Sequence, residues 1–404
     1  MAMGEFFTAP VEQIVPGGAG IVRYRGKSVF MDLTAPGDMV TGRITEEHQD
    51  WAEAELLEIL EPSPLRETPF CPLYGSCGGC SLQHLSYGAQ VKEKTRMLRE
   101  AFFRSGGFSS LPELAVHPSA PEGYRNRVQF HCITPRYPTR RPLPRSLGRN
   151  RPVLSRPGRG LGFKARKSGE IIPVTGCPVA DPGIGRALAE GALRSPPDKD
   201  RFTVYARGST LVCEGGISRG KASLLGRELL MDAGVFFQSN GNALEALIQE
   251  LREAAAEADP SLPMADIYCG VGTFAAFLGE FFPRIDLVEE NHRALNLARE
   301  NIPPVNCRFF PKKADSWAAC QGGRGKAPYG FITVDPPRQG LSATLRQWLI
   351  REGPPVLAYV SCDPATLARD GGELCRGGYG LEKLSFHDFY PQTAHIEALA
   401  VFKR

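Results

Sequence analysis

The sequence predicts three domains: a small β-barrel, a central α+β domain and a C-terminal α/β domain with a doubly wound parallel sheet. Short β-prone runs separated by Gly and Pro fill the beginning of the chain, whereas strands alternate with helical stretches from about residue 236. A length of 404 residues also suffices for two or three domains that each bury a core. We therefore expect domains at 1–62, 63–235 and 236–404.

The N-terminal segment contains the runs GAGIVRYRGKSVFMDL, GDMVTGRI and AEAELLEIL. Their spacing predicts a barrel of about five strands, a fold that often binds single-stranded nucleic acid. The alternative is a structural spacer. A linker is expected at Glu61-Pro62-Ser63-Pro64, because two prolines in four residues disfavour both helix and sheet.

The central segment is marked by cysteines. Three of them, Cys71, Cys77 and Cys80, lie within ten residues, and Cys177 is a plausible fourth ligand. Eleven cysteines in the whole chain are too sparse for a disulfide scaffold and the number is odd, so clustered thiols indicate metal binding or catalysis. Four thiolates suit a [4Fe–4S] cluster or a structural zinc, and their spacing alone does not decide which.

Charge is distributed unevenly along the chain. The net charge is +4, yet eleven Arg and Lys and no Asp or Glu lie between Arg136 and Lys167. Such a basic segment indicates a polyanionic partner such as nucleic acid, and the alternative is a solvated loop. No apolar run approaches the length of a membrane span and the first residues do not resemble an export signal, so we expect a cytoplasmic protein without a membrane partner.

The C-terminal segment has five expected parallel strands, ADIYC, RIDLVE, NCRFF, GFITVD and PVLAYVS, with helical stretches such as NHRALNLAREN between them. The last two strands, LEKLSFHDFY and HIEALAVFKR, have no helix between them and should form an antiparallel hairpin. Open α/β sheets bind ligands at the carboxyl ends of their strands. The glycine turn Gly270-Val271-Gly272 after the first strand and Glu289 after the second predict a nucleoside site there.

Two further strand ends carry reactive side chains. Asp335-Pro336-Pro337-Arg338 follows the fourth strand, and an arginine in the last position disfavours methylation of an exocyclic amine, which a related motif with an aromatic residue serves. Cys362 follows the fifth strand and is a candidate nucleophile. Asp363 suits an N-cap and Pro364 the first helical position, so a helix N-terminus is expected beside the thiol and should help to ionise it.

Six segments, in order CPLYGSCGGCSLQH, FFQSN, DIYCGVGTF, DPPRQG, YVSCDPATLARD and FYPQTAHIE, together resemble the bacterial RNA 5-methyluridine methyltransferase family. The resemblance spans nearly the whole chain. It is closest to members that carry an iron–sulfur cluster and methylate 23S ribosomal RNA. The first 60 residues resemble the family's N-terminal RNA-binding barrel, the TRAM domain, and the last domain resembles class I S-adenosylmethionine-dependent methyltransferases.

The resemblance implies a role for each of twelve residues. It implies that Cys362 is the nucleophile and Glu397 the base, and that a [4Fe–4S] cluster is held by Cys71, Cys77, Cys80 and Cys177. The residues implied around S-adenosylmethionine are Gln238, Tyr268, Thr273, Glu289, Asp315 and Asp335. Thr273 and Asp363 depart from the family, because Asn is usual at both positions.

The expected reaction is methylation of carbon 5 of a uridine in RNA. Carbon 5 of uracil becomes nucleophilic only after a thiolate adds at carbon 6, and a base must later remove the proton from carbon 5. We expect 23S ribosomal RNA as the substrate and a monomeric enzyme. The alternatives are the same reaction on transfer RNA and a non-catalytic RNA-binding iron–sulfur protein. An acidic residue at position 363, beside Cys362, is expected to raise the pKa of the thiol. The alternative is that the Asp363 side chain points away and only caps the helix.

Overall fold

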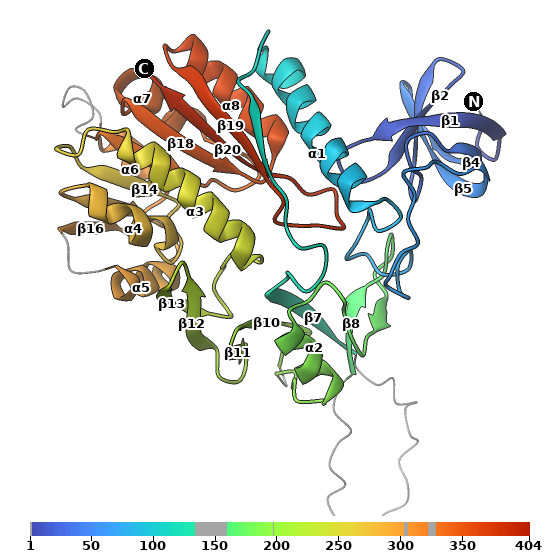
Figure 1. Ribbon diagram of the computed structural model, residues 1–404, viewed down its shortest axis with the longest axis horizontal. Helices are drawn as coiled ribbons and strands as arrows, with labels where there is room; N and C mark the ends of the chain where they lie inside the picture. Colours follow the sequence, from blue (N-terminus) through green and yellow to red (C-terminus); the bar gives the residue numbers. More distant parts are fainter. Residues whose placement is uncertain (1, 134–159, 197, 303–305, 322–328) are drawn as a thin grey trace, which may run out of the picture.

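The computed structural model describes residues 2–133, 160–196, 198–302, 306–321 and 329–404. A barrel lies at one end of the molecule, a large α/β sheet at the other, and a smaller sheet lies beside both (Figure 1). Among the described residues, no helix is long and apolar enough to cross a membrane. Most of the basic segment, Arg136 to Arg159, lies outside the described residues.

The N-terminal barrel is closed, as predicted, by five strands in the order β1-β2-β3-β5-β4. Buried and exposed residues alternate along β1, which places one face of the strand in the barrel core. Val22, Val29 and Val40 in that core are fully buried. The strands are β1 (Phe6–Ile14), β2 (Gly20–Tyr24), β3 (Lys27–Met31), β4 (Met39–Glu47) and β5 (Trp51–Glu61).

The smaller central sheet has the order β11-β10-β7-β8-β9 and packs against helix α2 (Pro182–Ala189). That helix begins with Asp181 as N-cap and Pro182 at its first position. The Asp181 side chain accepts a hydrogen bond from Gly183 N, and proline has no N–H that would need a partner. The strands are β7 (Arg127–Ile133), β8 (Gly160–Lys164), β9 (Ile171–Pro173), β10 (Arg201–Arg207) and β11 (Thr210–Cys213).

The large sheet has eight strands in the order β16-β15-β14-β17-β18-β20-β19-β6. The first five are parallel, and β20 runs antiparallel between β18 and β19, as expected for the closing hairpin. The strands are β14 (Met264–Ile267), β15 (Ile285–Val288), β16 (Cys307–Phe310), β17 (Phe331–Val334), β18 (Val356–Ser361), β19 (Gly380–His387), β20 (Glu397–Lys403) and β6 (Leu114–His117).

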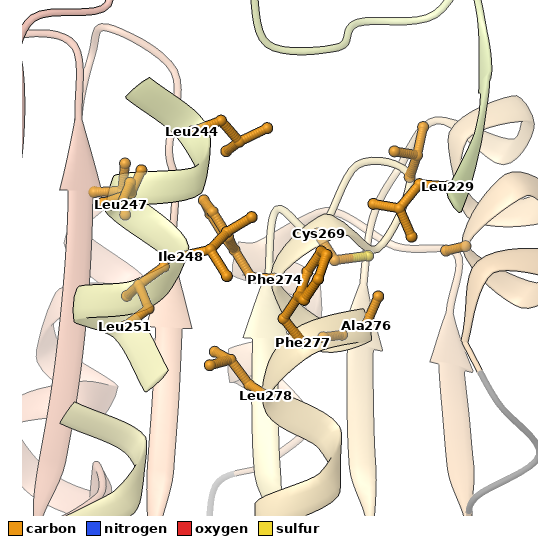
Figure 2. Packing of buried hydrophobic residues seen from close by; sticks show 14 of the residues in the cluster. Leu229, Leu244, Leu247, Ile248, Leu251, Cys269, Phe274, Ala276, Phe277 and Leu278 are labelled. Carbon is orange, nitrogen blue, oxygen red and sulfur yellow. The ribbon is translucent and has the colours of Figure 1, made fainter. Parts of the chain in front are cut away.

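Helices cover both faces of this sheet. Figure 2 shows apolar side chains of α3 packing beside those of α4, with the buried thiol of Cys269 among them. Because α3 buries one apolar face against the sheet, the residues leading into it are held close to the strand ends. The helical segments are α3 (Gly241–Ala256), α4 (Thr273–Leu278), η2 (Gly279–Phe281), α5 (His292–Asn301), α6 (Ala314–Ala319), α7 (Ala343–Glu352) and α8 (Pro364–Arg376).

The segment between residues 63 and 235 is divided in the structure. Strand β6 pairs with the outer edge of β19, and α1 (Tyr87–Ala101) with η1 (Phe102–Gly106) packs against α8. The hairpin of β12 (Arg219–Leu224) and β13 (Arg227–Asp232) also joins the core of the large domain. The local sequence pattern did not predict this division, because a four-residue strand and an amphipathic helix do not specify which sheet they join or pack against. Figure 1 shows α1 between that sheet and the barrel.

Candidate active site and cysteine cluster

Cys362 lies at the carboxyl end of β18, where the strand turns into α8. Asp363 is the N-cap of that helix and Pro364 its first residue, as predicted, and Asp363 Oδ1 accepts a hydrogen bond from Thr366 N at 2.9 Å. Antiparallel pairing of Ser361 with Ala398 brings the start of β20 beside this turn. Cys362 follows Ser361, and Glu397 precedes Ala398. Because the two strands are antiparallel, both residues lie at the same end of the pair, at the site.

Two carboxyl groups lie beside the thiol. Glu397 is 3% exposed, and Asp335, at the end of β17, is partly buried. Burial and the proximity of Asp335 raise the pKa of Glu397 well above its ordinary value. Burial, followed by a second buried carboxyl, Asp266, likewise raises the pKa of Asp335. A base with a raised pKa binds a proton more strongly than a surface glutamate, which suits proton abstraction near neutral pH.

The thiol of Cys362 has its pKa raised to about 11, first by burial and then by Glu397 and Asp335. The guanidinium of Arg338 lies close enough to oppose this effect, and its Nη2 is 3.4 Å from Nδ1 of His395. The helix N-terminus was expected to lower the pKa of Cys362, but burial and two carboxyl groups favour the neutral thiol and raise the pKa instead. Asp363 is not among the largest causes of this shift, and its carboxylate caps α8.

A cavity of about 510 Å³ opens beside the ends of β14 and β15 and is lined by Tyr268, Glu289 and Asp315. Glu289 accepts hydrogen bonds from the backbone N–H of Gly270 at 3.0 Å and of Asn291 at 2.7 Å, which fixes its carboxylate. Ser342 donates to Asp315, and this contact joins the beginnings of α6 and α7. Three of the six residues expected around the cofactor thus share one cavity.

The backbone of the turn after β14 is held in an uncommon conformation. Tyr268 has φ +65°, a region that non-glycine residues rarely adopt, and Gly272 has φ +78° as the N-cap of α4. A Cβ at Gly272 would lie 3.0 Å from Ala298 Cβ, so glycine is needed there for space as well as for conformation. The turn thereby brings Tyr268 to the edge of the cavity.

The other three expected cofactor residues do not line this cavity. Thr273 is the first residue of α4, and Asp335 directly follows β17. Gln238 precedes α3, and its Oε1 is buried without a hydrogen-bond partner among the described residues. A buried amide oxygen without a partner is costly, and a polar ligand group at this position would satisfy it. These observations fit a nucleoside cofactor at the carboxyl edge of the sheet.

The four predicted metal-ligating cysteines meet in a second cavity, of about 460 Å³, next to the central sheet. The loop 71–80 is fixed there by Gly78 N, which donates to Lys164 O of β8 at 2.9 Å. Burial, with smaller effects from neighbouring thiols, raises the pKa of Cys77, Cys80 and Cys177, for Cys80 to about 11. Arg125 lowers the pKa of all three, and thiols near a cation release their protons to a metal more readily.

The spacing of these sulfurs is wide. Among the described residues, the one group of three metal-type ligands with donor atoms within 4.8 Å of each other is His117, Glu250 and His387, so no three of the cysteine sulfurs are that close. A tetrahedral zinc with Zn–S bonds of about 2.3 Å needs thiolates roughly 3.8 Å apart. The four sulfurs are therefore not arranged as ligands of a single tetrahedral zinc ion.

Two family models match the C-terminal part of the chain. The model described as tRNA (Uracil-5-)-methyltransferase matches residues 326–404, and the methyltransferase small domain matches residues 226–358. An uncharacterised RNA methyltransferase of Treponema denticola is 31% identical, over 94% of both chains. The 23S rRNA (uracil(1939)-C(5))-methyltransferase RlmD of Alkalilimnicola ehrlichii is also 31% identical, over 96% of this chain and 94% of its own length.

This chain belongs to the RNA uracil-5-methyltransferase family. The fold is shared with a solved structure over nearly the whole chain. The solved structure of the Pyrococcus abyssi tRNA (uracil-54, C5)-methyltransferase, in complex with S-adenosyl-L-homocysteine, covers 98% of this chain and 100% of its own, with a TM-score of 0.71 and 22% identity. It agrees with a class I methyltransferase domain preceded by a small barrel.

The geometry does not suit metal binding by the group of His117, Glu250 and His387. The two imidazole rings are stacked 4.4 Å apart at an angle of 6°. A metal bound by both Nε2 atoms would have to lie in both ring planes, and two stacked parallel planes share no such point. Instead Glu250 accepts from His117 Nε2 at 2.6 Å and from His387 Nε2 at 3.1 Å, which joins α3 to β6 and β19.

Sequence reasoning missed the part played by two arginines. Arg338 was interpreted only as evidence against amine methylation, yet it is the cation beside the candidate nucleophile. Arg125 was not singled out, although it lies in the cavity of the four cysteines. The signal for Arg338 was present in its position three residues after Asp335 at a strand end. No local signal marked Arg125, because its proximity to the cysteines depends on the tertiary fold.

Proposed function

We propose that this protein methylates carbon 5 of a uridine in 23S ribosomal RNA, with Cys362 as nucleophile, Glu397 as base and S-adenosylmethionine as methyl donor. The observation that carries the proposal is the position of Cys362 beside Glu397 and Asp335, at the sheet edge that also holds the nucleoside cavity. A 23S rRNA substrate is supported by the relatives named RlmD, which match over nearly their full length.

The proposed reaction uses the chain's residues in a fixed order. The thiolate of Cys362 would add to carbon 6 of uracil, forming a C–S bond and an enolate. Carbon 5 of that enolate would take the methyl group of bound S-adenosylmethionine, whose S–CH₃ bond breaks as S-adenosylhomocysteine leaves. Glu397 then removes the proton from carbon 5, the C–S bond breaks, and the thiolate leaves. Because the resting thiol is largely neutral, Cys362, which is only partly buried, must lose its proton to solvent before attack. Arg338 stabilises the thiolate that results.

S-adenosylmethionine supplies an electrophilic methyl carbon and a positive sulfonium when it is bound. We assign its nucleoside part to the cavity of Tyr268, Glu289 and Asp315, where the fixed carboxylate of Glu289 suits ribose hydroxyls. Gln238, Thr273 and Asp335 are proposed to contact the rest of the molecule, with the unpaired Oε1 of Gln238 as an acceptor.

The cysteine cavity is proposed to hold a [4Fe–4S] cluster through Cys71, Cys77, Cys80 and Cys177. The sulfur spacing, too wide for a single zinc ion, supports a cluster. We further propose that residues 1–62 form an RNA-binding domain, that 63–235 carry the cluster and that 236–404 carry the methyl transfer. The protein is proposed to act as a monomer on RNA.

Covalent trapping tests the two catalytic roles. An RNA with 5-fluorouridine at the target has fluorine in place of the proton that Glu397 must remove, so the enzyme–RNA adduct should survive a denaturing gel. Cys362→Ala should form no adduct, and adduct formation by this variant would refute the nucleophile.

Mapping 5-methyluridine in a deletion strain tests the substrate. We expect 5-methyluridine to be lost from 23S rRNA. Its loss from transfer RNA would favour transfer RNA as the substrate, as in the matched tRNA (Uracil-5-)-methyltransferase family.

A further inference from the structure

The loop between β19 and β20, residues 388–396, leads directly into the proposed base Glu397 and is held by the N-terminal half of the chain. Three consecutive carbonyl oxygens of this loop accept hydrogen bonds from that half. Lys94 Nζ donates to Tyr390 O at 2.8 Å, and Tyr124 Oη donates to Pro391 O at 2.7 Å. The carbonyl of Gln392 accepts from the backbone N–H groups of Ser81 and Leu82, each at 2.9 Å.

Ser81 makes the contact nearest to the cysteines. It directly follows Cys80, and its Oγ accepts a hydrogen bond from Ala394 N at 3.1 Å, three residues before Glu397. Its own carbonyl accepts from Tyr74 Oη at 2.8 Å, so the residue is fixed from the side of the cysteine loop as well. A serine beside a metal-ligating cysteine is therefore bonded to the loop that carries the base.

Gln392 is fixed by α1. Its backbone N–H donates to Gln90 Oε1 and its side-chain oxygen accepts from Gln90 Nε2, both at 2.9 Å, deep in the interior where Gln90 is 1% exposed. Gln392 also has φ +67°, a conformation that costs free energy in any residue but glycine. A strained residue with this many buried hydrogen bonds is one whose position the surrounding structure determines.

We infer that Ser81 and Gln90 are positioning residues for methyl-uridine formation, because they hold the 388–396 loop and thereby set the position of the Glu397 carboxylate. The inference rests on the proposed role of Glu397 as base. The geometric reason is that proton abstraction needs the carboxylate within hydrogen-bond reach of carbon 5, and a small misplacement of a catalytic group slows its step strongly. The cysteine loop would thus serve the chemistry without taking part in it.

This inference predicts which step slows. Addition of Cys362 and methyl transfer both precede proton removal, so a misplaced Glu397 delays only the elimination that frees the enzyme from the RNA. A covalent enzyme–RNA adduct should therefore accumulate even with ordinary uridine in the RNA. Loss of the fold, or weaker RNA binding, would reduce the adduct instead.

The experiment compares Ser81→Ala and Gln90→Leu with the wild type, all purified without oxygen. Each variant should show a kcat lower by about tenfold to a hundredfold, with the KM for RNA changed by less than about twofold. Each should also accumulate an adduct with uridine RNA on a denaturing gel. Iron content, measured in parallel, should equal that of the wild type.

Ser76→Ala is the matched control, because it makes the same substitution in the same loop at an exposed serine beside Cys77. It should behave as wild type. Glu397→Gln is the benchmark and should accumulate the most adduct. If Glu397→Gln accumulates none, the proposed base is wrong. If it does, while Ser81→Ala and Gln90→Leu turn over normally without adduct, the positioning inference is wrong and the base assignment stands. Should Ser81→Ala lose iron, Gln90→Leu on α1 decides the outcome.

Discussion

The two sites built on cysteine sulfur differ in the charges that surround them. At the sheet edge, Cys362 lies beside Glu397 and Asp335, which add to the effect of burial and raise its pKa. In the cysteine cavity, burial also raises the pKa of the thiols, but Arg125 acts against it at Cys77, Cys80 and Cys177. The pKa of Cys362 and that of Cys80 are both raised to about 11, so burial keeps the thiols neutral at both sites. The sites differ in the groups that add to burial, which are carboxyl groups at Cys362 and neighbouring thiols at Cys80.

This difference corresponds to the proposed roles. A nucleophile that is neutral at rest is protected from oxidation and is activated when a cation arrives beside it, such as the sulfonium of the cofactor. Ligands of a permanent metal group need no such protection, because the metal keeps them deprotonated. Cys269 is a third case, since it is buried among apolar side chains near α4 (Figure 2) and its pKa is raised well above the ordinary value. It is expected to be unreactive.

The largest expected effect is at the cysteine cavity. Cys77→Ser removes one of four proposed ligands, and the anaerobically purified variant should lose the brown colour and the roughly four irons per chain expected of a [4Fe–4S] cluster. Iron and acid-labile sulfide analysis measures this directly. Cys213→Ser, at a partly buried cysteine outside the cavity, is the control and should keep its iron. One zinc per chain and no iron in the wild type would contradict the cluster.

The second effect concerns the carboxyl groups at Cys362. Glu397 and Asp335 both raise the pKa of this thiol, so replacing one carboxyl group with a neutral amide should stabilise the thiolate. Glu397→Gln should therefore move the pH dependence of Cys362 alkylation towards acid by on the order of one pH unit. The rate of labelling by iodoacetamide, followed by mass spectrometry of the Cys362 peptide, gives the profile. A shift towards alkali would contradict the arrangement of charges.

The sequence predicted the parts of this site that depend on local pattern. Alternation of strands and helices identified the sheet, and therefore placed Cys362 and Asp335 at one edge. Asp363 and Pro364 were predicted as N-cap and first helical residue because that preference is local. Contacts between distant segments were not predictable. Neither the pairing of β6 with β19 nor the bonds from Ser81 to the 388–396 loop has any signature in the residues around it.

A smaller effect is expected at Arg338. Its guanidinium lowers the pKa of Cys362, so Arg338→Gln should move the alkylation profile towards alkali. The side chain is exposed, and solvent screens its charge, so the shift should be a fraction of a pH unit. Arg338→Lys keeps the charge and should restore most of the wild-type profile. Equal profiles for Arg338→Gln and wild type would show that the cation does not act on the thiol.

The smallest effect is expected for Asp363→Asn, which tests whether a neighbour of Cys362 in the sequence also acts on its thiol in space. Asp363 is the neighbour of Cys362 along the chain, and a carboxylate there was expected to raise the thiol pKa. Its Oδ1 instead accepts from Thr366 N, and Ser361 Oγ accepts from the Asp363 N–H at 3.1 Å, so the side chain is turned into the first turn of α8. Asp363→Asn keeps a capping oxygen and removes only the charge. Its alkylation profile should therefore coincide with that of the wild type, in contrast to Glu397→Gln, which lies 34 positions further along the chain. An acid shift for Asp363→Asn as large as that for Glu397→Gln would mean that the cap opens in solution and that the carboxylate turns towards the thiol.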